Sequence, residues 1–337
     1  MKKLFLLATI LLGLTSQAQD GIPVYLDYLS DNYYLLHPSM AGAANCGKLR
    51  LTARQQWFDA DEAPNLQTLS FNTALGEESR SGIGAILFND RNGYTSQTGA
   101  YLSYAYHLPL SYDYGALNRL SFGINVGLVQ NRLDERTFDL TDFDPVIGGI
   151  LQSDSYFNAD IGLSYFYENF YAHGTVKNLL FQNRDIFTEE FESPNQRRYI
   201  ATIGYLFNFE GQFSKWGLEP SLLYHYVDRT EESFVDINLK GYYDLNEDTQ
   251  LWGALSYRRS QDGAEFVDGG QINDQQLQLF SPILGVKYKQ FIFGYTYSQQ
   301  IGDIQFEGSG GFHQLTLGIN FLCREERWHC DCPAVNN

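Results

Sequence analysis

Positive charge and long apolar runs are both scarce in this sequence. Lysine and arginine together number 23, against 40 aspartates and glutamates, which gives a formal net charge of −17. Nucleic-acid partners require a basic surface that neutralises phosphates, so this balance argues against nucleic acid. After the first twenty residues no run of ~18 apolar residues occurs, and we therefore expect no membrane-spanning helix.

Recognisable catalytic and metal-binding motifs are also missing. None of the six histidines stands in H-x-x-x-H or H-E-x-x-H spacing, and no G-x-S-x-G elbow is present. His107 or His225 beside a serine imitates a Ser-His pair, but a structural role is favoured for both. The segment Asp244–Asp248 begins like an EF-hand loop, yet Thr249 stands where glycine is required. We interpret this segment as an Asx-rich turn, and we expect neither a cofactor nor an enzyme.

The first twenty residues have the layout of a secretory signal peptide. Lys2 and Lys3 precede the apolar run Leu4–Leu14, and Ser16-Gln17-Ala18 is a small-x-small cleavage site. The apolar run is too short to span a membrane as a helix. We expect cleavage near Ala18, export of the chain, and a final location in the outer membrane.

Alternating polarity is the main structural signal, and it is clearest near the C-terminus. In Phe312–Leu322 the apolar residues occupy every second position from Leu315 to Phe321, so one face of an extended strand is apolar. A tilted strand of about ten residues is long enough to cross a bilayer. Fourteen strand candidates follow the first twenty residues and include this one: Lys48–Trp57, Gln67–Leu75, Ser81–Asn89, Thr95–His107, Arg119–Gln130, Ser155–Tyr167, Phe170–Lys177, Tyr199–Asn208, Lys215–Asp228, Glu232–Tyr243, Thr249–Arg258, Leu277–Lys287, Phe291–Gln299 and Gly311–Leu322.

The lengths of the connections favour a membrane barrel over a soluble sandwich, which alternates in the same way. Odd-numbered connections tend to be long, as in Asn131–Asp154 and Arg259–Gln276, and even-numbered ones tend to be short, as in Glu168-Asn169. Short periplasmic turns and long outer loops are typical of outer-membrane barrels. We therefore predict an all-β fold, a transmembrane barrel of about fourteen antiparallel strands, with its N-terminus in the periplasm.

Four parts of the chain are expected from these patterns. They are a signal peptide at 1–18, an N-terminal periplasmic or plug segment at 19–47, the barrel at 48–322 and a cysteine-containing periplasmic tail at 323–337. The second part carries an aromatic cluster that is costly to leave exposed. It is expected to be partly helical around Tyr25–Leu36 and to pack at the barrel mouth or in the lumen, with a mobile linker as the alternative.

The four cysteines are Cys46, Cys323, Cys330 and Cys332, an even number that suggests disulfides in an exported chain. Cys46 directly precedes the first strand and Cys323 directly follows the last, and these strands are neighbours in a closed barrel. We expect Cys46 to pair with one of the three C-terminal cysteines. A zinc site at Cys330 and Cys332 is the weaker alternative, because zinc prefers C-x₂₋₄-C spacing.

Several segments resemble one family of membrane proteins. His37-Pro38-Ser39-Met40-Ala41-Gly42 is similar to the N-P-A-x-A-G segment of the PorP/SprF family of type IX secretion membrane proteins. Arg54-Gln55-Gln56-Trp57 matches the family's R-Q-Q-W signature, and Pro64 and Gln67 match its A-P-x-x-Q signature. These six residues, together with His37, Pro38 and Gly42, are the candidate interaction sites. The resemblance extends from about Tyr25 to Leu322, while the cysteine-rich tail departs from the family pattern.

The resemblance implies a non-enzymatic outer-membrane component of the type IX secretion and gliding machinery. Such a protein is expected to bind a secreted adhesin or its C-terminal sorting domain, and to anchor it or assist its export at the cell surface. Periplasmic type IX ring components, a peptidoglycan-binding partner and outer-membrane lipid are the further partners implied. The alternative is a solute channel or porin, which requires an open lumen.

Overall fold

A computed structural model describes residues 32–56, 63–76, 80–111, 117–136, 149–180, 196–209, 215–268, 271–301 and 311–324, with the backbone alone for 264–275. The elements are two 3-10 turns, η2 (Tyr33–Leu35) and η3 (Pro38–Met40), and the strands β1 (Gly47–Gln56), β2 (Asn65–Leu75), β3 (Ser81–Asn92), β4 (Thr95–Pro109), β5 (Asn118–Asp134), β6 (Leu151–Tyr167), β7 (Phe170–Lys177), β8 (Arg198–Tyr205), β9 (Phe207–Asn208), β10 (Trp216–Val227), β11 (Ser233–Asn246), β12 (Thr249–Asp268), β13 (Gln271–Tyr288), β14 (Phe291–Ile301) and β15 (Phe312–Phe321).

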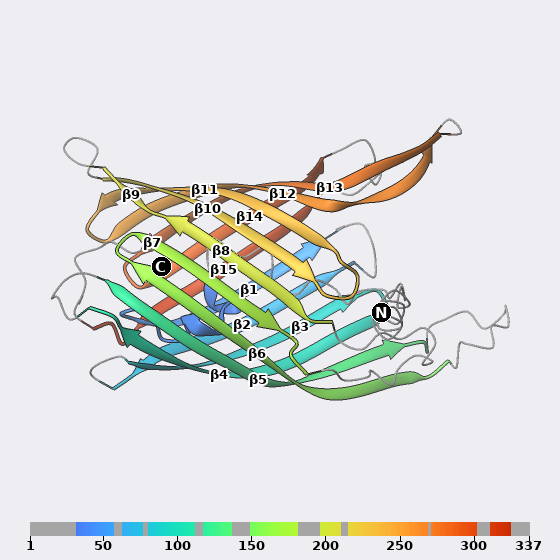
Figure 1. Cartoon of the computed structure of the whole chain (residues 1–337), viewed down its shortest axis with the longest axis horizontal. Helices are drawn as coiled ribbons and strands as arrows, with labels where there is room; N and C mark the ends of the chain where they lie inside the picture. Colours follow the sequence, from blue (N-terminus) through green and yellow to red (C-terminus); the bar gives the residue numbers. More distant parts are fainter. Residues whose placement is uncertain are drawn as a thin grey trace, which may run out of the picture.

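Antiparallel neighbours close the sheet into a barrel (Figure 1). The last strand pairs with the first from Gly47 opposite Phe321 to Gln56 opposite Phe312. Both β8 and β9 pair with β10 and are separated only at Leu206, so together they form one strand of the wall. The barrel therefore has fourteen strands, as the alternation predicted.

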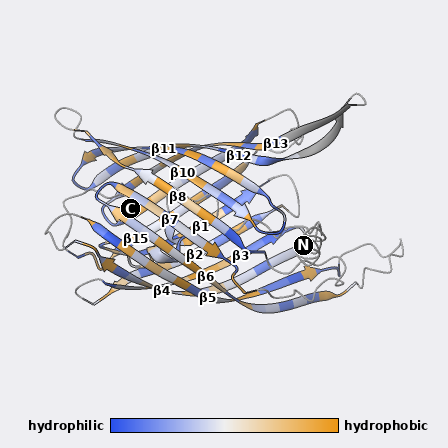
Figure 2. Ribbon diagram, viewed as in Figure 1, coloured by the Kyte–Doolittle hydropathy of each residue, from blue (hydrophilic) through white to orange (hydrophobic). Residues whose placement is uncertain are grey.

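Apolar side chains face outward and polar ones inward. Hydrophobic and hydrophilic residues alternate along the strands (Figure 2). On β15, Leu315 and Leu317 are 40% and 44% exposed, whereas Gln314 and Thr316 are each 1% exposed. A soluble sandwich would bury its leucines, so this arrangement identifies a wall that faces lipid.

Among the residues that the structure describes, no helix has the length and the apolar character needed to span a bilayer.

Two of the predicted connections contain strand residues. The predicted loop Arg259–Gln276 is wrong, because β12 continues to Asp268 and pairs with β13 up to its first residue, Gln271. The predicted loop Asn131–Asp154 is shorter at both ends, since β5 ends at Asp134 and β6 begins at Leu151. The sequence of these extensions lacks the regular alternation that marks a lipid-facing strand, so this alternation ends before the backbone pairing does.

A predicted turn is confirmed between β11 and β12. The amide of Asp248 donates to the side-chain oxygen of Asn246 at 3.0 Å, which is the hydrogen bond of an Asx turn.

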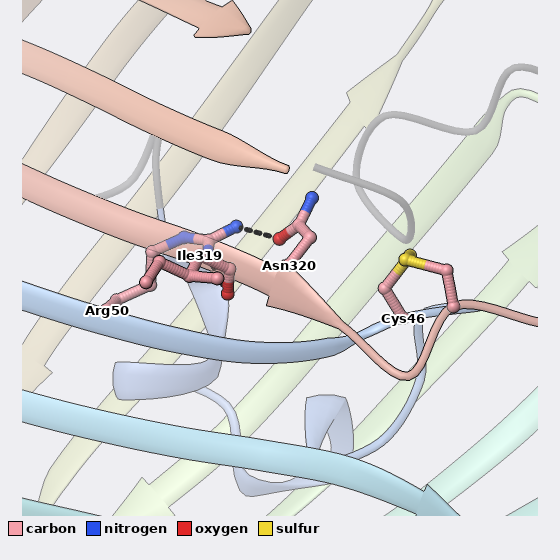
Figure 3. The surroundings of a disulfide bond; sticks show 5 residues. Cys46, Arg50, Ile319 and Asn320 are labelled. Atoms are coloured by element: carbon pink, nitrogen blue, oxygen red, sulfur yellow. Dashed lines mark hydrogen bonds between the residues drawn. A yellow bond between two sulfur atoms is a disulfide. The ribbon is translucent and has the colours of Figure 1, made fainter. Parts of the chain in front are cut away.

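A disulfide at one end of the barrel seam joins the residue before β1 to a residue just after β15, which confirms the expected pairing of Cys46 with a C-terminal cysteine (Figure 3). Its partner is Cys323, 277 residues away in the sequence. Arg324 then hydrogen-bonds to the carbonyls of Ala74, at 3.1 Å, and Gly76. Cys330 and Cys332 lie outside the described residues.

Candidate functional site: the plugged lumen

Residues 32–46, which we call the plug, fill part of the lumen. Nearly all of them are buried, including η2 and η3, and η3 packs against β4, β5 and β6. In the described part of the range Tyr25–Leu36, where a helix was expected, the structure has the single 3-10 turn η2. Residues 19–31 lie outside the described residues. The segment follows the barrel wall in two short turns, and its polar groups hydrogen-bond to inward-facing side chains.

His37 is anchored between two strands of the wall. Its Nδ1 atom lies 2.8 Å from the hydroxyl of Thr175 on β7, and its Nε2 atom lies 3.1 Å from the hydroxyl of Thr202 on β8. One ring nitrogen of a neutral histidine donates and the other accepts, and a threonine hydroxyl serves either role. Burial lowers the pKa of His37 well below its ordinary value, and the nearby His173 and Lys177 lower it further. The ring is therefore neutral at pH 7 and forms a polar link between plug and wall.

Small hydroxyl side chains on the wall receive other polar groups of the plug. The phenol of Tyr34 lies 2.5 Å from the hydroxyl of Ser103 on β4. The hydroxyl of Ser39 lies 2.6 Å from that of Ser164 on β6. Asn32 donates to Ser70 on β2 at 2.8 Å. These contacts attach the plug along its length rather than at one point.

Basic and imidazole groups from the wall bind the carbonyls of the plug. Lys177 donates to the carbonyl of Leu35 at 2.9 Å, and both terminal nitrogens of Arg119 donate to that of Ala43 at 3.1 Å. His107 donates from Nε2 to the carbonyl of Ala41 at 3.0 Å, and its Nδ1 lies 2.8 Å from the hydroxyl of Ser121. The Ser-His pair suspected from the sequence therefore exists, and its imidazole holds the plug.

Glycines allow the plug to approach the wall closely. Gly42 has a φ of +65° and lies against β3, where a Cβ on Gly82 would meet the carbonyl of Ala41 and come within 2.9 Å of the Gly42 Cα. Gly42 also donates from its backbone amide to the side chain of Asn72 at 3.1 Å. A side chain at Gly82 would occupy space that the plug backbone already fills. Gly82 thus allows contact between the backbones of β3 and the plug.

Beyond the plug, a chain of hydroxyl groups reaches a buried carboxylate. The phenols of Tyr33 and Tyr171 lie 2.9 Å apart, and Tyr171 donates to Glu219 on β10 at 2.5 Å. Tyr242 on β11 donates to the second oxygen of Glu219 at 2.5 Å. Glu219 is thus bound by two phenols in a nearly dry site, and it links the plug to the strands on that side.

Two other carboxylates in the lumen have different kinds of partner. Asp236 makes two contacts of 2.7 Å to the guanidinium of Arg258. Asp160 instead accepts from the side chain of Asn125 and the backbone amide of Asn178. On the first strand, Arg50 donates to Asn320 at 2.7 Å (Figure 3).

The candidate interaction residues separate into two groups. His37, Pro38 and Gly42 belong to the plug and are buried. The other group lies at the far end of β1 and the start of β2, where Arg54 stacks on Phe312 with 3.8 Å between its guanidinium carbon and the ring centroid. The backbone amide of Gln56 donates to the carbonyl of Pro64 at 3.0 Å, and Gln55 lies opposite Asn65 and His313 in the strand register. Gln67 is exposed on the outer face, and Trp57 lies outside the described residues.

The residues that bind the plug from the wall were missed by reading the sequence. Ser164, Thr175 and Thr202 are each 4% exposed or less and stand at inward positions of their strands. The sequence feature that could have identified them is their small size. An empty lumen of this width would have room for large polar side chains at these inward positions, whereas serine and threonine leave space for the plug. Within the described part of the chain, no cluster of histidine, cysteine and acidic residues has the geometry of a metal site.

A closed barrel of fourteen antiparallel strands, apolar outside and polar inside, defines an outer-membrane β-barrel protein. Here the lumen holds the chain's own N-terminal segment. The profile of the family described as Type IX secretion system membrane protein PorP/SprF matches residues 16–319. The chain belongs to this family and is a membrane component of type IX secretion.

Solved structures with some likeness are outer-membrane barrels of low sequence identity. The TodX deltaS2S3 mutant, a monoaromatic hydrocarbon channel, has a TM-score of 0.49 and 12% identity, with 91% of this chain and 95% of that chain covered. The outer membrane protein Omp33 of Acinetobacter baumannii has a TM-score of 0.41 and 8% identity, with 83% and 100% covered. The fold is assigned from the strand pairing and not from these structures. A comparison with curated proteins found no match.

Proposed function

We propose that the protein is a non-enzymatic adaptor that binds a secreted adhesin through its C-terminal sorting domain and anchors it or assists its export. The observation that carries the proposal is the plug, whose side chains and carbonyls are hydrogen-bonded to β2, β4, β5, β6, β7 and β8. An adaptor has no need of an open path for solutes, whereas a porin does. Family membership supports the same role.

The seam disulfide adds to this argument. Cys46 ends the plug, and its bond to Cys323 ties that end to the strand that closes the barrel. Arg324 reaches the carbonyls of Ala74 and Gly76 at the short turn after β2. The C-terminal end of the plug therefore lies beside the short turns, which we assign to the periplasm.

With the short turns in the periplasm, each proposed partner can be assigned to one end of the barrel. The N-terminal segment and the tail 323–337 would meet the periplasmic ring components and a peptidoglycan-binding partner, and the opposite end would meet the secreted polypeptide. The proposal includes the division of the chain into a signal peptide (1–18) that is cleaved near Ala18, an N-terminal segment (19–47), the barrel (48–322) and the tail (323–337).

The test is co-purification of the full chain from native membranes, with recovered proteins identified by mass spectrometry. We expect an adhesin with a C-terminal sorting domain, and its recovery should be abolished when that domain is deleted. Unchanged recovery after the deletion would overturn the adaptor role. Planar-bilayer recordings test the alternative, because a steady open conductance of the wild-type protein would favour a solute channel.

A further inference from the structure

The rim of the barrel is uneven at the end opposite the Cys46–Cys323 bond. The β12–β13 hairpin projects beyond the neighbouring strands at this end, as Figure 1 shows in orange. The register shifts between Arg259 and Gly263, and the pairing then runs from Gly263 opposite Gln276 to Asp268 opposite Gln271. The hairpin is therefore a two-stranded ribbon that continues the barrel wall outward.

One edge of this ribbon has no neighbouring strand in the described part of the chain. The pairing of β11 with β12 ends at Phe234 opposite Ser260. The connection between β10 and β11 is short, and the structure describes all of its residues. It forms a tight turn, in which the amide of Val227 donates to the carbonyl of Glu232 at 2.9 Å. From Gly263 to Asp268, β12 thus pairs with β13 on one side and with no described strand on the other.

An edge of this kind offers a row of backbone donors and acceptors to another chain. Natural proteins usually protect such edges, and a ribbon of two strands is marginally stable in water without a third. Six residues of strand present about 20 Å of edge, enough to pair with a short extended segment. The sequence here contains no proline that would prevent pairing.

The charge of the ribbon indicates the chemistry of its partner. Residues 259–276 contain four carboxylates, Asp262, Glu265, Asp268 and Asp274, and one guanidinium, Arg259. Asp262 accepts a hydrogen bond from the backbone amide of Ser233 at 2.6 Å, which helps to fix the base of the ribbon. A segment that carries lysine or arginine would approach this ribbon favourably, and an acidic one would be repelled.

We propose that the free edge of β12 from Gly263 to Asp268 is a docking site for an extended, basic segment of the secreted polypeptide, which adds to the ribbon as a further strand. Backbone hydrogen bonds would supply affinity, and the acidic ribbon would supply selectivity. This inference rests on the proposed function, because it takes the secreted polypeptide as the occupant.

The experiment uses the full chain in detergent and a fluorescent peptide of about eight residues in which lysine alternates with valine or threonine. One control peptide carries N-methyl groups on alternate amides along one edge, and another replaces lysine with glutamate. In a shortened variant, residues 260–277 are replaced by Asn-Gly, so that the paired residues Arg259 and Gln278 flank a two-residue hairpin loop. Heat-modifiable migration in gels verifies that this variant keeps its barrel.

We expect binding of the lysine peptide to weaken by about tenfold or more on N-methylation, on lysine-to-glutamate replacement and on removal of the ribbon, since each removes several hydrogen bonds or the charge attraction. Hydrogen exchange should slow at alternate amides from Gly263 to Asp268 when the peptide binds. The sorting domain of the co-purified adhesin should displace the peptide.

The other outcomes separate the two proposals. If the sorting domain binds equally well with and without the ribbon, the docking edge is refuted and the adaptor function stands. If the peptide binds the edge but the sorting domain neither binds nor displaces it, the assigned occupant is refuted together with the adaptor function. Dimers of the chain that disappear with the ribbon, without peptide binding, would show that a second copy occupies the edge.

Discussion

Gly82 on β3 lies directly against Ala41 of the plug, so closely that a Cβ on Gly82 would meet the Ala41 carbonyl. The carbonyl of Ala41 is bound on another side by the imidazole of His107 at 3.0 Å. One peptide group of the plug is thus confined between a glycine and a histidine of the wall. Close confinement of this kind makes the docking of the plug sensitive to single atoms.

The first prediction concerns this contact. Gly82→Ala should displace the plug, because overpacking of a tight contact costs about 1–3 kcal/mol. The expected result is a rise in planar-bilayer conductance and faster proteolysis within residues 32–46. Gly174→Ala is the matched control, since a Cβ at this strand glycine meets no atom within 4 Å. Equal conductance and proteolysis in the two variants would contradict the tight docking of the plug.

The second prediction concerns pH. The pKa of His37 is lowered by burial and by the neighbouring His173 and Lys177, while the hydroxyls of Thr175 and Thr202 hold its neutral ring. In the released plug, by contrast, the imidazole takes up a proton below its ordinary pKa of 6.5. Docking should therefore be independent of pH above this value and should weaken by about 1.4 kcal/mol per pH unit below it.

Proteolysis of the plug between pH 8 and pH 5 measures this effect. The rate should rise below pH 6.5, and His37→Gln should flatten the profile, because glutamine keeps hydrogen-bonding groups but does not titrate. A His37→Gln profile as steep as that of the wild type would assign the pH dependence to other groups, such as His173.

The sequence predicts the wall better than it predicts the plug. Alternation from Leu315 to Phe321 is a local property of one strand, so the sequence separates an apolar face from a polar one. The pattern of long and short connections then predicts that the apolar face is outside. The contact of His37 with Thr175 joins residues 138 positions apart and leaves no periodic trace. Similarly, the predicted loop at Arg259–Gln276 was wrong because a strand outside the lipid no longer needs an apolar face.

The third prediction concerns the seam disulfide. Replacing both Cys46 and Cys323 with serine should lower the free energy of unfolding, because the bond closes a loop with a sequence separation of 277. The loop-entropy relation gives an upper value of about 5.6 kcal/mol for a loop of this length. Urea titration in detergent should show a lower midpoint, and reductant should produce the same shift in the wild type only. A variant with serine at Cys330 and Cys332 is the control, and a shift of equal size in that variant would indicate a different pairing.

The last prediction concerns the ion pair between Asp236 and Arg258. The guanidinium binds both carboxylate oxygens at 2.7 Å and lies over the ring of Phe234, with the Asp236 side chain 1% exposed. Asp236→Asn should reduce the free energy of unfolding by about 3–5 kcal/mol, because it leaves a buried cation without this carboxylate. Replacing both residues with leucine should cost less than the single change, because no buried charge is then left without its counterion. Urea titrations of the two variants decide the matter. A double variant less stable than Asp236→Asn would show that the pair contributes more than mutual neutralisation, and would assign it a direct part in holding β11 to β12.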